Sequence, residues 1–299
     1  MNLLNISIGK LALQNPIMPA SGTFGFGEEV AAFAGMDLSR LGAMVGKTAT
    51  LEPRDGNPQP RICECEGGMV NSIGLEGKGI DYILEYNVPF MASFGVPIIF
   101  NISGFSLNDF ALLAQKANSV KAISAIEGNI SCPNVEGGKI PFGSTAKAAS
   151  EVTTVICEVT DLPVIIKLTP NVEPKSMIGE IASAVEEAGA DAISMINTVK
   201  RQNIGGIPFC GLSGPPIKPI ALELIKIVLE QISIPVIGMG GISCLEDVLE
   251  FLQLGCSAVA IGTANFSNPL IMMEIINGLE KYCQDNQIYD LTQLRGIVE

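Results

Sequence analysis

Ala122-Ile-Ser-Ala-Ile126, followed closely by Asn129-Ile-Ser-Cys-Pro-Asn134, is the stretch that says most about the fold. The apolar run predicts a buried strand, and Pro133 ends it because proline has no N–H for the ladder. Cys132 therefore lies where a strand gives way to a loop, and Gly137-Gly138 allow that loop conformations closed to other residues. Catalytic groups favour such loops, but most free cysteines are small buried hydrophobes. Position alone leaves both interpretations of Cys132 open.

Similar apolar, β-branched runs recur along the chain and alternate with segments of helical periodicity. This alternation is typical of βαβ units around a parallel sheet. The eight runs are Asn15–Ser21, Ala43–Ala49, Pro97–Ser103, Ala122–Ser131, Pro163–Thr169, Ala192–Thr198, Pro235–Ile242 and Ala258–Ala264. Eight parallel strands with intervening helices predict an α/β fold, a closed (β/α)8 TIM barrel, although counting alone also permits a doubly wound sheet.

Two further segments fit a barrel. Leu3–Leu13 alternates in polarity around Gly9-Lys10 and predicts a β-hairpin before the first barrel strand. The long segment from Leu51 to Val96 is rich in Gly, Pro and Asn, and an insertion of this size after a strand usually builds the mouth of the site. We expect one domain spanning residues 1–299.

The composition excludes several classes of function. A formal net charge of −13 disfavours nucleic acid as a partner. The absence of histidine excludes a Ser-His-Asp triad and a His-containing metal site. The eight cysteines lack Cys-x-x-Cys spacing, so we expect neither a metal nor an iron–sulfur cluster on this chain. Without a signal peptide or a run long enough to span a bilayer, we expect a cytoplasmic protein with reduced thiols.

Polar groups gather at the predicted strand ends. Lys47 and Lys167 each end an apolar strand in a chain that is poor in cations. A single lysine at a strand end is often a solvated surface group, but two such lysines favour a role in a site. Gly238-Met-Gly-Gly-Ile242 and Gly262-Thr263 end the last two strands, and each precedes a helix. Glycine-rich ends at these two strands are the usual phosphate site of barrels, where backbone N–H groups hold the anion.

Nine motifs, taken in order, resemble one family. They are Asn15-Pro-Ile-Met-Pro-Ala-Ser-Gly22, Gly46-Lys-Thr48, Met69-Val-Asn-Ser-Ile-Gly-Leu75, Asn129-Ile-Ser-Cys-Pro-Asn134, Lys167-Leu-Thr-Pro-Asn171, Asn197-Thr198, Gly211-Leu-Ser-Gly214 with Ile217-Lys-Pro-Ile-Ala-Leu222, Gly238-Met-Gly-Gly-Ile242 and Gly262-Thr263. The chain resembles the flavin-dependent dihydroorotate dehydrogenases of pyrimidine biosynthesis, and most closely the catalytic subunits of the NAD-linked class 1B.

The resemblance implies an FMN enzyme that oxidises (S)-dihydroorotate to orotate. Cys132 would be the base at C5, while hydride passes from C6 to N5 of FMN. The substrate-binding residues implied are Lys47, Asn71, Ser72, Ile73, Gly74, Leu75, Asn129, Asn134, Asn197 and Thr198. The FMN-binding residues implied are Ser21, Lys47, Thr48, Asn101, Asn129, Lys167, Ile196, Gly214, Gly240, Gly241, Gly262 and Thr263.

The resemblance also implies a partner. Class 1B catalytic subunits form a homodimer that pairs with a second subunit carrying FAD and a [2Fe–2S] cluster, giving a heterotetramer that passes electrons to NAD. This chain has neither a cluster-type cysteine pattern nor a dinucleotide fingerprint, so it needs such a partner to reach NAD. Two segments depart from the family pattern at the predicted mouth: Glu76-Gly-Lys-Gly79 replaces Gln-Asn-Pro-Gly, and the stretch from Lys200 to Cys210 is shorter.

Four alternatives remain at this stage. A subunit like dihydropyrimidine dehydrogenase would share the barrel, FMN and cysteine but act on uracil or thymine, whereas Asn134 and Lys47 favour a carboxylate-bearing substrate. A class 1A-type enzyme would pass electrons to fumarate. A phosphate-binding lyase or isomerase would form a Schiff base at Lys167. A non-catalytic paralogue is disfavoured because Cys132, Lys47 and Lys167 are all present.

Overall fold

The computed structural model describes residues 3–131 and 141–296. Its central sheet has eight parallel strands in the order β3-β14-β13-β10-β9-β8-β7-β4, so each strand lies beside its neighbour in chain order. The strands are β3 (Ile17–Pro19), β4 (Met44–Val45), β7 (Ile98–Ile102), β8 (Ile123–Asn129), β9 (Val164–Lys167), β10 (Ala192–Met195), β13 (Val236–Met239) and β14 (Ala258–Ile261). Each lies within one of the eight predicted runs.

The barrel closes where β3 meets β4. The N–H of Gly42 donates to the carbonyl oxygen of Ile17 at 2.8 Å. A Cβ at Gly42 would lie only 2.1 Å from the carbonyl oxygen of Asn15, so this close approach requires glycine. The prediction of a (β/α)8 barrel is confirmed.

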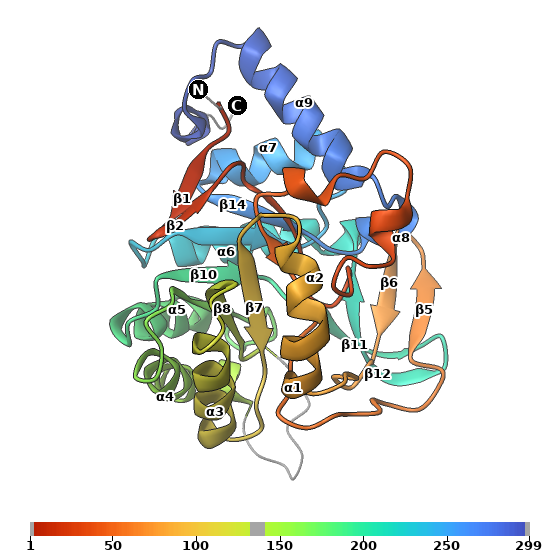
Figure 1. Ribbon diagram of the computed structural model, residues 1–299, viewed down its shortest axis with the longest axis vertical. Coiled ribbons are helices and arrows are strands. Elements are labelled where there is room, and N and C mark those ends of the chain that lie inside the picture. The colour runs from red at the N-terminus through yellow and green to blue at the C-terminus, as the bar shows by residue number, and fades with distance from the viewer. Residues whose placement is uncertain (1–2, 132–140, 297–299) are drawn as a thin grey trace.

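Helices cover the outside of the barrel (Figure 1). Polar caps start two of them, since the hydroxyls of Ser106 and Thr145 accept from the N–H groups of Asp109 and Ala148. Between β3 and β4 the described chain has two 3₁₀ turns in place of an α-helix, η1 (Val30–Ala32) and η2 (Leu38–Arg40). No helix in the described ranges is both long and apolar enough to cross a membrane. The remaining helical elements are α1 (Ile80–Tyr82), the π-helical η3 (Ile83–Asn87), α2 (Val88–Ala92), α3 (Leu107–Asn118), η4 (Phe142–Ser144), α4 (Ala146–Cys157), α5 (Met177–Glu187), η5 (Pro215–Ile217), α6 (Lys218–Leu229), α7 (Leu245–Leu254), α8 (Ala264–Ser267), α9 (Ile271–Asp285) and η6 (Leu291–Leu294).

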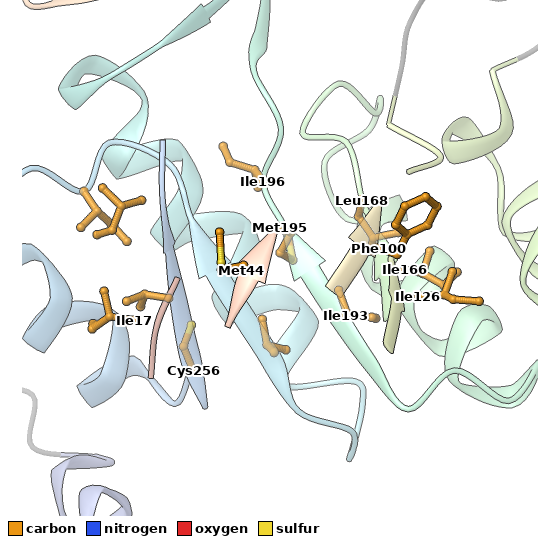
Figure 2. Close-up of a cluster of buried hydrophobic side chains, with 14 of the residues drawn as sticks. Ile17, Met44, Phe100, Ile126, Ile166, Leu168, Ile193, Met195, Ile196 and Cys256 are labelled. Atoms are coloured by element: carbon orange, nitrogen blue, oxygen red, sulfur yellow. The ribbon is translucent and has the colours of Figure 1, made fainter. Parts of the chain in front are cut away.

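Alternation along each strand divides the side chains into two sets. One set faces the helices and forms the main core, in which Ile17, Ile166 and Ile193 are almost wholly buried (Figure 2). The other set fills the barrel and includes Ile165 and Ile237. Both faces of the strands are therefore buried, as expected of a parallel sheet covered by helices.

The predicted N-terminal hairpin is present. Strands β1 (Ile6–Ile8) and β2 (Leu11–Leu13) pair antiparallel, with Ile8 opposite Leu11. Ile8, Leu11 and Leu13 pack into the same apolar cluster as the inward-facing barrel residues. The hairpin therefore closes the amino-terminal end of the barrel, and the carboxyl ends of the strands are left for a site.

The insertion after β4 contributes to a second sheet that the sequence analysis did not predict. Strand β5 (Ile62–Cys65) pairs with β6 (Gly68–Asn71), β6 pairs with β12 (Ile207–Ser213), and β12 pairs with β11 (Val199–Ile204). This four-stranded antiparallel sheet, here the mouth sheet, lies at one side of the barrel, away from α3 to α5 (Figure 1). It joins the long insertion to the shortened segment after β10.

Candidate active site

A cavity of about 340 Å³ opens where the barrel strands end and the mouth sheet begins. Its size lies within the range of small-molecule sites. The predicted site residues that line it are Ser21, Lys47, Thr48, Asn71, Ser72, Ile73, Gly74, Leu75, Asn129, Lys167, Ile196, Asn197, Thr198, Gly214, Gly240, Gly241, Gly262 and Thr263. Residues from seven of the eight strand ends and from two insertions thus meet at one place.

Two predicted residues, Cys132 and Asn134, lie outside the described residues. One described residue, Asn101, does not line the cavity. Asn101 is 1% exposed and lies deeper in the barrel, where its amide donates to the carboxylate of Glu127. The side-chain oxygen of Asn101 is buried and has no hydrogen-bond partner among the described residues. A direct contact of Asn101 with FMN stays a prediction.

Lys167 is a buried cation at the floor of the cavity. Its side chain is on the inner face of β9, the residue is 3% exposed, and its Nζ donates to the Ser21 hydroxyl at 3.1 Å. Burial lowers the pKa of Lys167, and the nearby negative charge of Glu127 opposes that shift. Burial thus disfavours the charged form of this amine, and Glu127 favours it.

Glu127 is a residue that the sequence analysis missed. It is 3% exposed, and its two carboxylate oxygens accept from the Asn101 amide and from the Ser194 hydroxyl. The signal was available, because Glu127 is two residues from both Ala125 and Asn129 and so shares the inner face of β8 with them. A carboxylate on the inner face of an apolar strand needs a partner, and Lys167 is the cation facing it.

Lys47 also lines the cavity, next to the segment that follows β3. Its Nζ is 3.8 Å from the position that a Cβ on Gly22 would take. The small residues after β3 therefore leave room for this lysine. Both lysines that the sequence placed at strand ends face the same cavity.

Glycines form the edge of the cavity next to β13 and β14. Gly214, Gly240 and Gly241 all have positive φ, and a Cβ on Gly241 would lie 2.7 Å from Cβ of Lys218 and 3.0 Å from the carbonyl oxygen of Gly214. This edge brings backbone groups directly to the cavity, as a phosphate site requires. Lys218 is not free to bind a phosphate, because its Nζ donates to Asp247 at 2.6 Å and to Glu250 at 2.7 Å, which raises its pKa.

The segment from Ser72 to Leu75 covers the cavity on the side of the insertion. Asn57 braces it: the Asn57 N–H donates to the carbonyl oxygen of Ile73 at 2.8 Å, and the Asn57 amide donates to that of Ser72 at 2.9 Å. Leu75 adopts a φ of 55°, which is uncommon for leucine. Asn171, which the sequence analysis gave no role, also lines the cavity and braces Thr198 through its carbonyl oxygen at 3.0 Å.

The outer rim of the cavity is apolar and exposed. Ile62 of β5, Phe209 of β12 and Phe266 of α8 line the cavity and are 50%, 62% and 53% exposed. Lys200 and the buried thiol of Cys210 also belong to this side of the cavity. Exposed apolar side chains concentrated at the entrance of a site indicate contact with another molecule.

Five thiols of the described chain are poor candidates for a base. Burial is the first cause that raises the pKa of Cys157, Cys210, Cys244, Cys256 and Cys283, to about 11 for Cys157 and about 12 for Cys256. A thiol with such a pKa is almost wholly protonated near neutral pH. No cluster of three or more metal-ligating side chains is found within residues 3–131 and 141–296.

Fold and cavity define a (β/α)8 barrel enzyme with a polar, glycine-edged site at the carboxyl ends of its strands. Residues 3–283 match the family model of dihydroorotate dehydrogenase. The chain belongs to the dihydroorotate dehydrogenase family, whose members are flavin-dependent oxidoreductases.

Individual relatives cover nearly the whole chain. A protein from Desulforamulus reducens is 48% identical over 301 residues, which are 98% of this chain and 97% of that protein. A protein from Anoxybacillus flavithermus is 48% identical over 284 residues, which are 92% of this chain and 89% of that protein. Both are named dihydroorotate dehydrogenase B (NAD(+)), catalytic subunit. The family expected from the nine motifs is thus confirmed.

Proposed function

We propose that this protein oxidises (S)-dihydroorotate to orotate with FMN as its cofactor, in the pathway that makes UMP. One observation carries the proposal: two lysines, four carboxamide side chains and the glycine-rich edge meet in one cavity. The names of the relatives point to the same substrate.

The described residues suit a flavin mononucleotide. Gly214, Gly240 and Gly241 leave backbone groups open at one end for a phosphate. Deeper in the barrel, the buried oxygen of Asn101 has no partner in the described part of the chain. Lys167, which lines the same cavity and contacts Ser21, would supply a positive charge to the flavin. When bound, the flavin would supply the acceptor for the hydride from C6 of the substrate.

The chain's own residues would bind, orient and deprotonate the substrate. Asn71, Asn129 and Asn197 face the cavity and would hold the pyrimidine ring, with Ile73, Gly74 and Leu75 closing over it. Lys47 would attract its carboxylate. Cys132 would remove the proton from C5, because a thiol of ordinary pKa near about 8.5 is a usable base near neutral pH and the chain has no histidine.

Electrons would leave through a partner. We propose a homodimer of this chain joined to a subunit that carries FAD and a [2Fe–2S] cluster, with NAD as the final acceptor, since the relatives are named as catalytic subunits of an NAD(+) enzyme. The exposed Ile62, Phe209 and Phe266 at the rim offer an apolar surface for that contact. An enzyme that uses fumarate, as in class 1A, is the alternative for the acceptor.

The test is turnover of the FMN-loaded protein with defined substrates and acceptors. With an artificial electron acceptor, dihydroorotate should be converted to orotate, and dihydrouracil should not react. Turnover with fumarate alone would replace the NAD-linked proposal by the class 1A alternative. Conversion of dihydrouracil but not dihydroorotate would replace the substrate by that of a dihydropyrimidine dehydrogenase.

A further inference from the structure

The hydroxyl of Ser131 joins two carboxamides that come from different strand ends. Ser131 Oγ donates to Oδ1 of Asn129 at 2.5 Å, and Nδ2 of Asn197 donates to Ser131 Oγ at 2.5 Å. Ser131 is 3% exposed, so water does not compete for these bonds. One buried hydroxyl therefore connects the ends of β8 and β10.

The direction of this chain of hydrogen bonds is fixed by the backbone. The N–H of Ser131 donates to Oδ1 of Asn129 at 3.2 Å, and the N–H of Thr198 donates to Oδ1 of Asn197 at 2.7 Å. A backbone N–H cannot accept a hydrogen bond, so each of these contacts requires the amide oxygen, and neither amide can be turned over without losing it. The Ser131 hydroxyl must then accept from Asn197 and donate to Asn129.

Both amide oxygens are consequently held by the protein, while N–H groups remain for the cavity. Asn129 and Asn197 both line the cavity, and Asn129 Nδ2 has no hydrogen-bond partner within the described residues. Asn197 Nδ2 donates one of its two protons to Ser131, and the other remains for a ligand. Asparagine can offer a ligand either an acceptor or a donor. Asn129 Oδ1 already accepts two hydrogen bonds, so Asn129 offers the cavity only donors, whereas Asn197 Oδ1 accepts one bond and keeps a second lone pair.

We propose that Ser131 is a positioning residue that ties Asn129 to Asn197 and makes this wall of the cavity specific for ligand groups that accept hydrogen bonds, namely carbonyl or carboxylate oxygens. The inference rests on the proposed function, because it explains how the site would recognise the oxygens of orotate. It assigns a role to a side chain that the substrate itself need not touch.

Ser103 provides a matched control. It is also 3% exposed, and its hydroxyl donates to the main-chain carbonyl oxygen of Asn129 at 3.1 Å. Ser103→Ala thus removes an equally buried hydroxyl that contacts the same residue, but it leaves both carboxamides in place. Ser131→Ala removes the link between them.

The experiment compares these two variants with the wild type as FMN-loaded full-length proteins. Orotate binding is followed through the change it causes in the flavin absorbance, and FMN affinity and thermal stability are measured alongside. In parallel, selective ¹⁵N-asparagine labelling reports hydrogen exchange of the Asn129 and Asn197 side-chain amides without any ligand. This second arm does not depend on the identity of the substrate.

Ser131→Ala is expected to weaken orotate binding about tenfold, which corresponds to the loss of roughly one net hydrogen bond, with FMN affinity unchanged. The Asn197 amide protons should exchange faster in this variant only, and Ser103→Ala should bind orotate within about twofold of the wild type. Equal weakening by both variants, or unchanged Asn197 exchange in Ser131→Ala, would overturn the inference. A wild-type holoprotein that does not bind orotate would overturn the proposed function instead, and the exchange arm would then decide the role of Ser131 alone.

Discussion

The same strands build both ends of the barrel interior, but one end is lined by apolar side chains and the other by polar and charged ones. At the amino-terminal end, Ile165 and Ile237 pack with the hairpin into an apolar cluster. Two residues further along β9 the inner face carries Lys167, and neighbouring strands add Asn101, Glu127 and Ser194, all 3% exposed or less. One end is closed by an apolar cluster, and the other contains buried polar and charged groups that hydrogen-bond to one another.

The amino-terminal end of the barrel interior therefore contributes mainly to stability, and the carboxyl end carries the groups suited to chemistry. At the apolar end, side chains are buried without desolvation of polar groups. At the polar end, burial lowers the pKa of Lys167 and so disfavours its charged form. Polar groups kept at such a cost are expected at a functional site. Substitutions at the two ends should therefore have different consequences, in the order given below.

The largest effect is expected from Cys132→Ala, which removes the proposed base. Loss of a general base should slow flavin reduction by dihydroorotate about 10²- to 10⁴-fold without loss of FMN, measured by anaerobic stopped-flow absorbance. Cys157→Ala is the control, because the pKa of the Cys157 thiol is raised to about 11 and it lies on α4 outside the barrel. Equal rates in wild type and Cys132→Ala would remove the cysteine from the mechanism.

Ile165→Ala tests the apolar end. Ile165 is 1% exposed, and the cavity left by its truncation should lower the free energy of unfolding by about 2–5 kcal/mol. Urea denaturation measures this loss, and the folded variant should still reduce its flavin at close to the wild-type rate. A variant of normal stability that has lost flavin reduction would break the division between the two ends.

Gly241→Ala tests the glycine edge. The added Cβ would lie 2.8 Å from the backbone nitrogen of Lys218 at a φ of +80°, so the edge must shift and FMN binding should weaken by about tenfold or more. Gly95→Ala is the matched control, since Gly95 also has positive φ (+71°) but no atom within 4 Å of its Cβ position. Apoprotein titrated with FMN gives both affinities, and similar weakening in the two variants would show that the edge has no special role.

The smallest effect concerns the pH dependence of stability. The pKa of Lys167 is lowered in the folded protein, so at pH values between that pKa and about 10.4 the unfolded chain binds more protons, and stability rises with pH. Between about pH 8 and about pH 10, FMN-free wild type should therefore gain stability relative to Lys167→Met. Thermal unfolding of both proteins across this range measures the difference, and a constant difference would mean that Lys167 has an ordinary pKa.

Much of the barrel could be predicted from the sequence because strand and helix signals are local. All eight apolar runs and the turn at Gly9-Lys10 became the expected elements. The strands are shorter than the runs, since β4 keeps only two residues and the flanking ones enter the loops that form the site. The mouth sheet was missed because its strands come from two insertions over a hundred residues apart, and β5 and β12 carry exposed Ile62 and Phe209 where a buried strand would be expected.

The site was predicted less completely than the fold, for a physical reason. Motifs identified residues that face the cavity, but the groups that hold them in place, Glu127, Ser131 and Asn171, act through contacts between strands. Asn101, which is expected to contact the flavin, lies beside Glu127, because alternation on β7 turns it into the barrel next to β8. Pairing between strands, which a single sequence does not reveal, decides these positions.

The most direct test of the account is an anaerobic reaction of the FMN-loaded wild type with one equivalent of dihydroorotate. Flavin absorbance near about 450 nm, typical of the cofactor, and orotate formation are followed in the same sample. The account predicts that the flavin is bleached and that one orotate appears for each flavin reduced. A protein that keeps its FMN fully oxidised in the presence of dihydroorotate would contradict it.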